Sequence, residues 1–304
     1  MQLDKTSIVI EQRSADEIFD LSLVVLRNYW RRLVPLAILG ALPFFLLNLL
    51  LLQPFMDFDR LVMSSREYAS REGFLAVYLW VLAAVVYLQS PLAMTGVTYY
   101  LGQAVFTEEP SSQQVLRHLR KHWLSLTWIL GLVRGSLLSL LCLAYTYLGY
   151  ANTTQAAIAI SVYLLVVYLI RGFRPFASEI LLLELRPVLK HRSKPDELLY
   201  ARRSRWLHAS SGDLFSVQMG LTMISFAFVA VFSLGGLFMI GVLLGTWTWG
   251  WWMNAVIFPI VLWMMSLWGT VIRFLLYMNT RIRSEGWEIE LKLRAESQRL
   301  VGAT

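Results

Sequence analysis

Long apolar blocks alternate with short polar stretches along the whole chain. Most of the blocks run for about 18 residues or more, and a hydrocarbon core near 30 Å is crossed by about 20 helical residues. Helices are expected because lipid offers no partners to free backbone groups. The pattern therefore predicts an all-α integral membrane protein with six transmembrane helices, at Leu33–Gln53, Phe74–Gly96, Trp123–Leu148, Gln155–Ile170, Val217–Gly245 and Met253–Tyr277.

Three of the polar stretches share a layout. Each begins with a serine that can cap a helix, mixes apolar with basic positions and ends on tryptophan: Ser14–Trp30, Ser111–Trp123 and Ser193–Trp206. Such segments are typical of amphipathic helices that lie at the membrane surface. They predict three repeats of a surface helix followed by a helical hairpin. The alternative is that basic, tryptophan-bearing loops arise in inner-membrane proteins without any repetition.

The composition agrees with a membrane protein and gives it an orientation. The chain is 57% hydrophobic and only 15% charged, against roughly 25% charge in soluble domains. Most Lys and Arg residues lie in the N-terminal segment, in 107–122, in 171–213 and in the C-terminal tail. The positive-inside rule then predicts two cytoplasmic termini. The expected parts are a cytoplasmic segment 1–32 with its surface helix, a membrane domain 33–279 and a cytoplasmic helix 280–304.

The net charge of +7 indicates a partner for the basic segments. These charges flank the predicted spans, where each Lys or Arg near an anionic leaflet contributes about 1 kcal/mol of attraction. We therefore expect the bilayer and its anionic headgroups as partners, and no nucleic acid. The densest basic patch on the predicted membrane surface is formed by Arg202, Arg203 and Arg205.

Two stretches at predicted cytoplasmic exits resemble a known family. RIRSEGWEIEL at Arg281–Leu291 and RPFASEILLLE at Arg174–Glu184 resemble motifs in a set of uncharacterised bacterial multi-span proteins. Those proteins are similar to the membrane domain found beside glycerophosphodiester phosphodiesterases. Trp287 and Glu288 stand where a Phe–Asp pair is usual. The resemblance implies a bacterial inner membrane and an accessory role, and it does not imply phosphodiesterase chemistry, which belongs to a separate soluble barrel.

The sequence shows no set of residues that would carry catalysis. His118 and His122 are four residues apart and share a helix face, but a zinc site needs three or four protein ligands. The predicted spans contain no His, Asp or Glu, which argues against an intramembrane enzyme. We therefore expect no catalytic site, no metal and no cofactor.

Arg134 lies inside the third apolar block, where a charge costs on the order of 3 kcal/mol or more to insert. If the excess length of this helix protrudes inward, Arg134 lies in the inner half of the bilayer and its guanidinium can extend toward cytoplasmic water; if not, a partner is expected. Glu179 and Glu184 follow the fourth block, while Arg171 and Arg273 lie near inner helix ends. We predict that these five residues form a polar pocket in the inner half of the membrane. Such a pocket would either lock the bundle or bind a lipid phosphate.

These features predict a non-enzymatic scaffold or subunit of a membrane complex. Its inner loops and tails would dock a protein partner on the cytoplasmic side, or a second copy of the chain. The alternative is a lipid or small-solute binding or transport protein that uses the polar pocket. Transporters often contain inverted repeats, whereas the repeats predicted here run in the same direction and number three.

Overall fold

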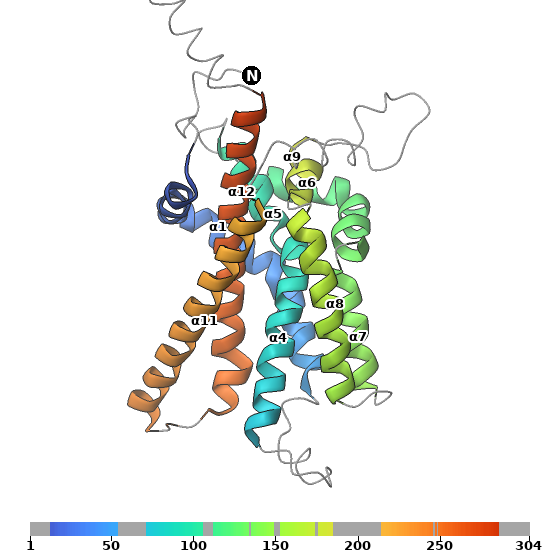
Figure 1. Cartoon of the computed structure of the whole chain (residues 1–304), viewed down its shortest axis with the longest axis vertical. Helices are drawn as coiled ribbons and strands as arrows, with labels where there is room; N and C mark the ends of the chain where they lie inside the picture. Colours follow the sequence, from blue (N-terminus) through green and yellow to red (C-terminus); the bar gives the residue numbers. More distant parts are fainter. Residues whose placement is uncertain are drawn as a thin grey trace, which may run out of the picture.

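The computed structural model describes residues 13–53, 71–105, 112–133, 135–148, 153–173, 176–184, 214–245, 247 and 249–285, and every element in these ranges is a helix. The elements, shown in Figure 1, are α1 (Ala15–Leu51), α4 (Arg71–Ala93), α5 (Thr95–Ala104), α6 (Ser112–Leu126), η2 (Thr127–Val133), α7 (Ser136–Tyr147), α8 (Thr153–Phe173), α9 (Ala177–Leu183), α11 (Leu214–Leu244), η4 (Met253–Ile257) and α12 (Phe258–Glu285). The predicted all-α class is confirmed over these residues.

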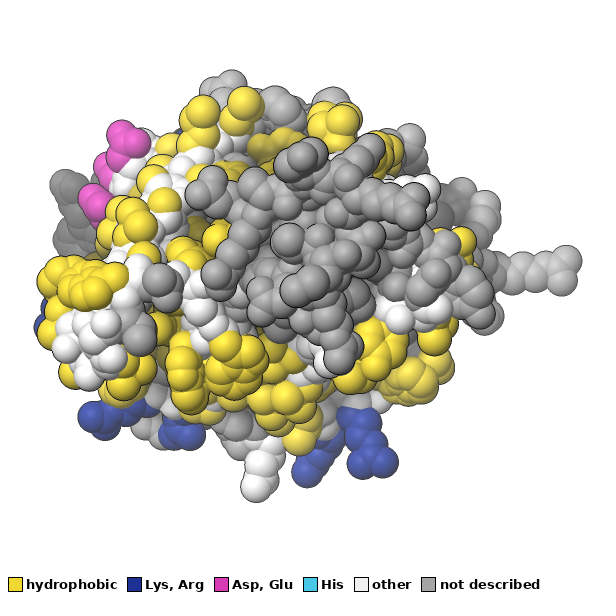
Figure 2. Space-filling view, turned by 90° about the horizontal axis from the view of Figure 1, so that it is seen from below, with side chains coloured by type: hydrophobic (Ala, Val, Ile, Leu, Met, Phe, Trp, Pro, Cys, Tyr) yellow, Lys and Arg dark blue, Asp and Glu magenta, His cyan; other side chains and the backbone are white. Residues whose placement is uncertain are grey.

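Four of the described helices are long and apolar enough to cross a membrane. They contain the spans Ala15–Leu51, Leu75–Ala93, Val217–Leu244 and Met253–Ser284. A fifth span is possible if α8 and α9, which are bent by 58° at a short break, are counted together. These helices are those expected of a membrane protein. Viewed from the lower end, the described surface is largely hydrophobic, with charged side chains only at its rim (Figure 2).

Helix α1 begins where its sequence predicts. The Ser14 side chain accepts a hydrogen bond from the Glu17 amide at 3.4 Å, and the Ser14 amide donates to the Glu17 carboxylate at 2.9 Å. The helix then continues to Leu51, so the predicted surface helix and first span form one element. No glycine separates the two parts, and Arg31 and Arg32 between them favour helix.

The third apolar block was predicted as one helix, Trp123–Leu148, and the structure divides it. The α-helix α6 passes into the π-helix η2, and α7 begins only at Ser136. Gly135 between them has a φ of +85°, and the Tyr163 hydroxyl occupies the place that a Cβ would take. Only glycine fits such a backbone without strain, so this residue marks the break.

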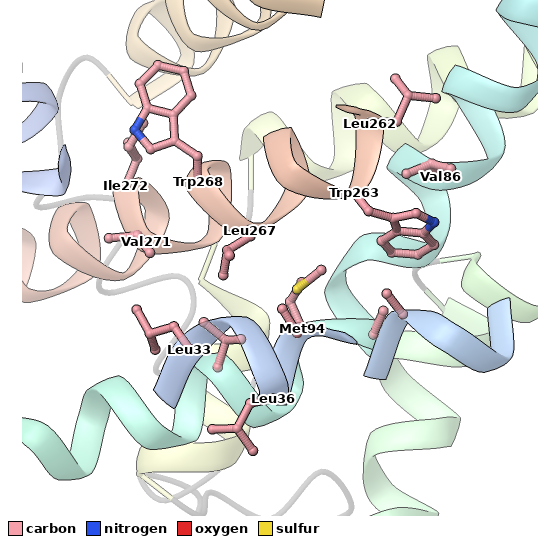
Figure 3. Packing of buried hydrophobic residues seen from close by; sticks show 14 of the residues in the cluster. Leu33, Leu36, Val86, Met94, Leu262, Trp263, Leu267, Trp268, Val271 and Ile272 are labelled. Carbon is pink, nitrogen blue, oxygen red and sulfur yellow. The ribbon is translucent and has the colours of Figure 1, made fainter. Parts of the chain in front are cut away.

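The core lies around α12, which packs against α1, α4, α5 and α11. Leu33 and Leu36 of α1 lie opposite Leu267 of α12, with Met94 between the two helices (Figure 3). Gly40 allows α1 to pack closely on α4, because a Cβ at this position would overlap the Ala93 carbonyl oxygen. Small residues permit this kind of approach in lipid.

Helix α11 is packed differently from the other long helices. Only 11% of its most apolar stretch is buried, against 61% for the corresponding stretch of the span that contains α12. It contacts α12, η4 and α8 and slants outward along one side of the bundle (Figure 1). Most of its surface is therefore open to the membrane or to another protein.

Candidate functional site

The short helix α9 carries a buried carboxylate into the bundle. The Glu179 side chain is 0% exposed, and its Oε1 accepts from Nε of Arg273 at 2.8 Å. The Ser178 hydroxyl donates to Oε2 at 2.8 Å. Residues 177–182 are all buried, so the carboxylate has no access to solvent. A buried charge requires a paired and hydrogen-bonded partner, and α12 supplies it.

The second predicted acid also reaches α12. The Tyr277 hydroxyl donates to Oε1 of Glu184 at 2.8 Å. Tyr277 is fully buried, and its ring meets Phe176 edge-on at 5.6 Å between centroids. Arg273 and Tyr277 are four residues apart and therefore share a face of α12. Glu179 within α9 and Glu184 at its C-terminal end thus attach this helix to one face of α12.

Arg171, at the end of α8, has a different partner. Its Nη1 and Nη2 atoms donate to the carbonyls of Tyr87 at 2.6 Å and Leu88 at 2.8 Å, and its guanidinium lies 4.4 Å from the centre of the Tyr87 ring. Pro91 explains this arrangement. It has no N–H, so the Tyr87 carbonyl four residues earlier lacks its backbone donor and accepts instead from Arg171 and from the Ser90 hydroxyl, the latter at 2.9 Å. Ser136 adds a hydrogen bond to Leu88 at 2.7 Å.

The structure describes four of the five residues of the predicted pocket. Glu179 and Arg273 form an ion pair, and Glu184 bonds to α12 beside them. Arg171 donates to two backbone carbonyls of α4. Arg134 lies outside the described residues, as do Arg202, Arg203 and Arg205. The described contacts are of the kind that lock a bundle.

A second proline site joins η4 to α4. In η4 the Phe258 amide bonds to the Met253 carbonyl, so the same π-helical spacing would pair the Asn254 carbonyl with residue 259. That residue is proline and has no N–H. The Tyr78 hydroxyl of α4 donates to the Asn254 carbonyl instead, at 2.7 Å. The only signal in the sequence was Pro259 itself.

A buried pair of amides joins α1 to α4. Asn48 and Gln89 exchange two hydrogen bonds, at 2.8 and 2.9 Å, and are 2% and 0% exposed. Hydropathy does not indicate that these two residues meet, because 41 positions separate them. The exchange satisfies an oxygen and a nitrogen on each side chain, which makes burial of both amides tolerable.

The two histidines of α6 lie together beside α5. His118 stacks on Tyr99 at 4.1 Å between ring centroids, and His122 lies 4.7 Å from His118. Burial lowers the pKa of His118, and the neighbouring His122 and Lys121 lower it further. Among the described residues, no group of three or more His, Cys, Asp or Glu is placed to hold a metal ion.

No protein-family model, curated protein or solved structure matches the chain. The resemblance to the membrane domain beside glycerophosphodiester phosphodiesterases stays a prediction.

Proposed function

We propose that the chain is a non-enzymatic subunit or scaffold of a membrane complex in a bacterial inner membrane. It would cross the membrane six times, with both termini in the cytoplasm. The observation that carries this proposal is the exposure of α11, the least buried of the four long apolar helices.

The open surface of α11 combines large and small residues. Phe226 is 59% exposed and Val231 is 65% exposed. Nothing lies within 4 Å of the position that a Cβ would take at Gly235, and Ala227 and Ala230 are exposed as well. Contact with lipid chains does not require small residues, whereas helix–helix interfaces in membranes are enriched in them because they let the two backbones approach closely. The surface thus favours a helix of another subunit.

The polar interior supports a non-catalytic role. The buried acid of α9, the arginine of α8 and the amide pair between α1 and α4 are engaged in bonds that join helices. An active site instead leaves reactive groups free to meet a substrate in a cavity. These polar groups therefore account for stability and leave docking to the outer surfaces.

The distribution of described charges supports the proposed orientation. Basic side chains gather on the first half of α1, on α6 and at the end of α12, at Arg27, Arg31, Arg32, Arg117, Arg120, Lys121, Arg281 and Arg283. Helices α6 and α9 and the C-terminal end of α12 all lie at the upper end of the bundle (Figure 1). The positive-inside rule would place this end in the cytoplasm.

Site-specific cross-linking in cells tests the proposed complex. A photoreactive residue replaces Phe226 of α11 in the full chain, and in a control it replaces Val162 of α8, which is 60% exposed. We expect one protein adduct of defined mass from position 226 and none from position 162. Adducts with lipid alone at both positions would contradict the proposal. Adducts at twice the mass of the chain would indicate self-association in place of a scaffold.

A further inference from the structure

An open groove lies between α1 and α6, at the junction of α4 with α5. Its volume is about 360 Å³, and its apolar walls include Leu36, Leu39, Leu92, Val115, Leu116 and Leu119. Val115 and Leu36 are 1% and 8% exposed and form the floor, while Leu39 and Leu116 are 57% and 55% exposed and form the edges. We call this the α1–α6 groove.

The walls of the groove contribute little polarity. Thr95 lines it, but its hydroxyl donates to the Leu92 carbonyl at 2.9 Å. Gln113 is the other polar residue of the lining. The volume is roughly that of a dozen water molecules at ~30 Å³ each. Because its walls offer so few polar groups, the groove suits an extended apolar chain better than a compact polar solute.

Helical spacing places one arginine of α1 and one of α6 near lining residues of the groove. Arg32 stands one turn before Leu36 on α1, and Arg120 stands one turn after Leu116 on α6. Residues four apart share a helix face, so each arginine lies on the face that its helix presents to the groove. Both are exposed. The described part of α6 contains no acid, and the nearest described acid of α1 is Asp20, three turns away.

We propose that the α1–α6 groove holds one acyl chain of an anionic phospholipid whose phosphate lies between Arg32 and Arg120. The acyl chain would gain little free energy by moving from the bilayer into the groove, because bilayer lipid is as apolar as the leucines of the groove. The charged headgroup must therefore supply the selectivity. Each arginine near an anionic group accounts for roughly a fivefold change in affinity, and the two together for roughly 25-fold. The proposal does not depend on the scaffold role.

Lipid titration of the purified full chain tests this assignment. Native mass spectrometry counts bound lipids when phosphatidylglycerol or phosphatidylcholine is added to the delipidated protein in detergent. We expect one phosphatidylglycerol to bind at least roughly tenfold more tightly than phosphatidylcholine. The double variant Arg32→Gln/Arg120→Gln should lose this preference.

A charge-matched control separates the groove from general electrostatics. Arg31→Gln/Lys121→Gln removes two positive charges from the same helices, at positions turned away from the groove by helical spacing. This control should retain the preference. An equal loss in both double variants, or equal binding of the two lipids by the unchanged protein, would overturn the proposal.

A third variant tests the acyl-chain part. A Cβ at Gly96 would meet Leu119 at 3.7 Å and Leu36 at 3.9 Å, which is ordinary contact, so Gly96→Ala fits and Gly96→Leu extends into the groove. We expect Gly96→Leu to weaken lipid binding and Gly96→Ala to leave it nearly unchanged. Inorganic phosphate is the competitor that tests the alternative. If it displaces the lipid as effectively as short-chain phosphatidylglycerol does, the groove does not hold an acyl chain.

Discussion

Replacing Arg273 by methionine should destabilise the bundle strongly, and a second substitution at Glu179 should recover part of the loss. In Arg273→Met the Glu179 carboxylate remains at 0% exposure with Ser178 as its remaining described partner. Removing one member of a buried ion pair costs about 3–5 kcal/mol, whereas replacing both members is often close to neutral. Glu179→Gln alone should cost less, because the Arg273 side chain is 17% exposed and can reach water.

The free energy of unfolding is measured for the unchanged chain, the two single variants and the double variant, by denaturant titration in mixed micelles followed by circular dichroism. We expect Glu179→Gln/Arg273→Met to be about 2 kcal/mol or more stabler than Arg273→Met alone. The reasoning is refuted if the two losses add, because additivity would mean that Arg273 contributes packing and not charge compensation.

Three further predictions concern other contacts of the described structure. Arg171→Met should cost about 2–3 kcal/mol, since hydrogen bonds from a charged donor are lost. It should cost less in a Pro91→Ala background, where the helix regains an N–H for the Tyr87 carbonyl; equal costs would argue against that exposed carbonyl as the reason for the arginine. Gly40→Ala should cost about 1–3 kcal/mol by overpacking, while Gly235→Ala in open space should be neutral or stabilising by up to about 1 kcal/mol, and thermal unfolding compares them. The lowered pKa of His118 means that the unfolded chain binds more protons below its ordinary value of about 6.5, so the unfolding temperature should fall on acidification from about pH 7.5 to about pH 5, and less so in His118→Phe.

The sequence predicts the long apolar helices well because the constraint on them is local. Lipid leaves the backbone no partner outside its own helix, so an apolar block of sufficient length indicates a helix whatever surrounds it. The blocks Phe74–Gly96 and Val217–Gly245 agree closely with Arg71–Ala93 and Leu214–Leu244. The same holds for the N-terminal cap of α1, which depends on residues three positions apart.

The breaks and the polar contacts could not be predicted in the same way. Gly135 ends a helix through its left-handed backbone and its contact with Tyr163, and neither can be read from hydropathy. The sequence predicts Glu179 and Glu184 as candidate partners of arginines. Their spacing along the chain does not reveal that α9 packs toward α12. Which arginine meets which acid is decided by the packing of distant segments.

The prolines explain why so many of these polar contacts involve α4. A proline exposes a carbonyl, and no water is available in lipid to satisfy it, so a side chain of the same helix or of another helix must donate to it. Arg171 of α8 serves the carbonyl that Pro91 exposes in α4, and Tyr78 of α4 serves the one that Pro259 exposes beside α12. Each of these hydrogen bonds therefore joins two helices at a fixed position.

Helix α11 lies outside this system of polar contacts. Its described side-chain bond to another helix is a contact of 3.4 Å between Tyr168 of α8 and Thr222, and it contains no proline whose carbonyl would need an external donor. A helix held mainly by apolar contacts along one side exchanges one apolar neighbour for another at little cost in lipid. That difference makes α11 the helix best suited to pack against another subunit, and it is the physical basis for placing the cross-linker at Phe226.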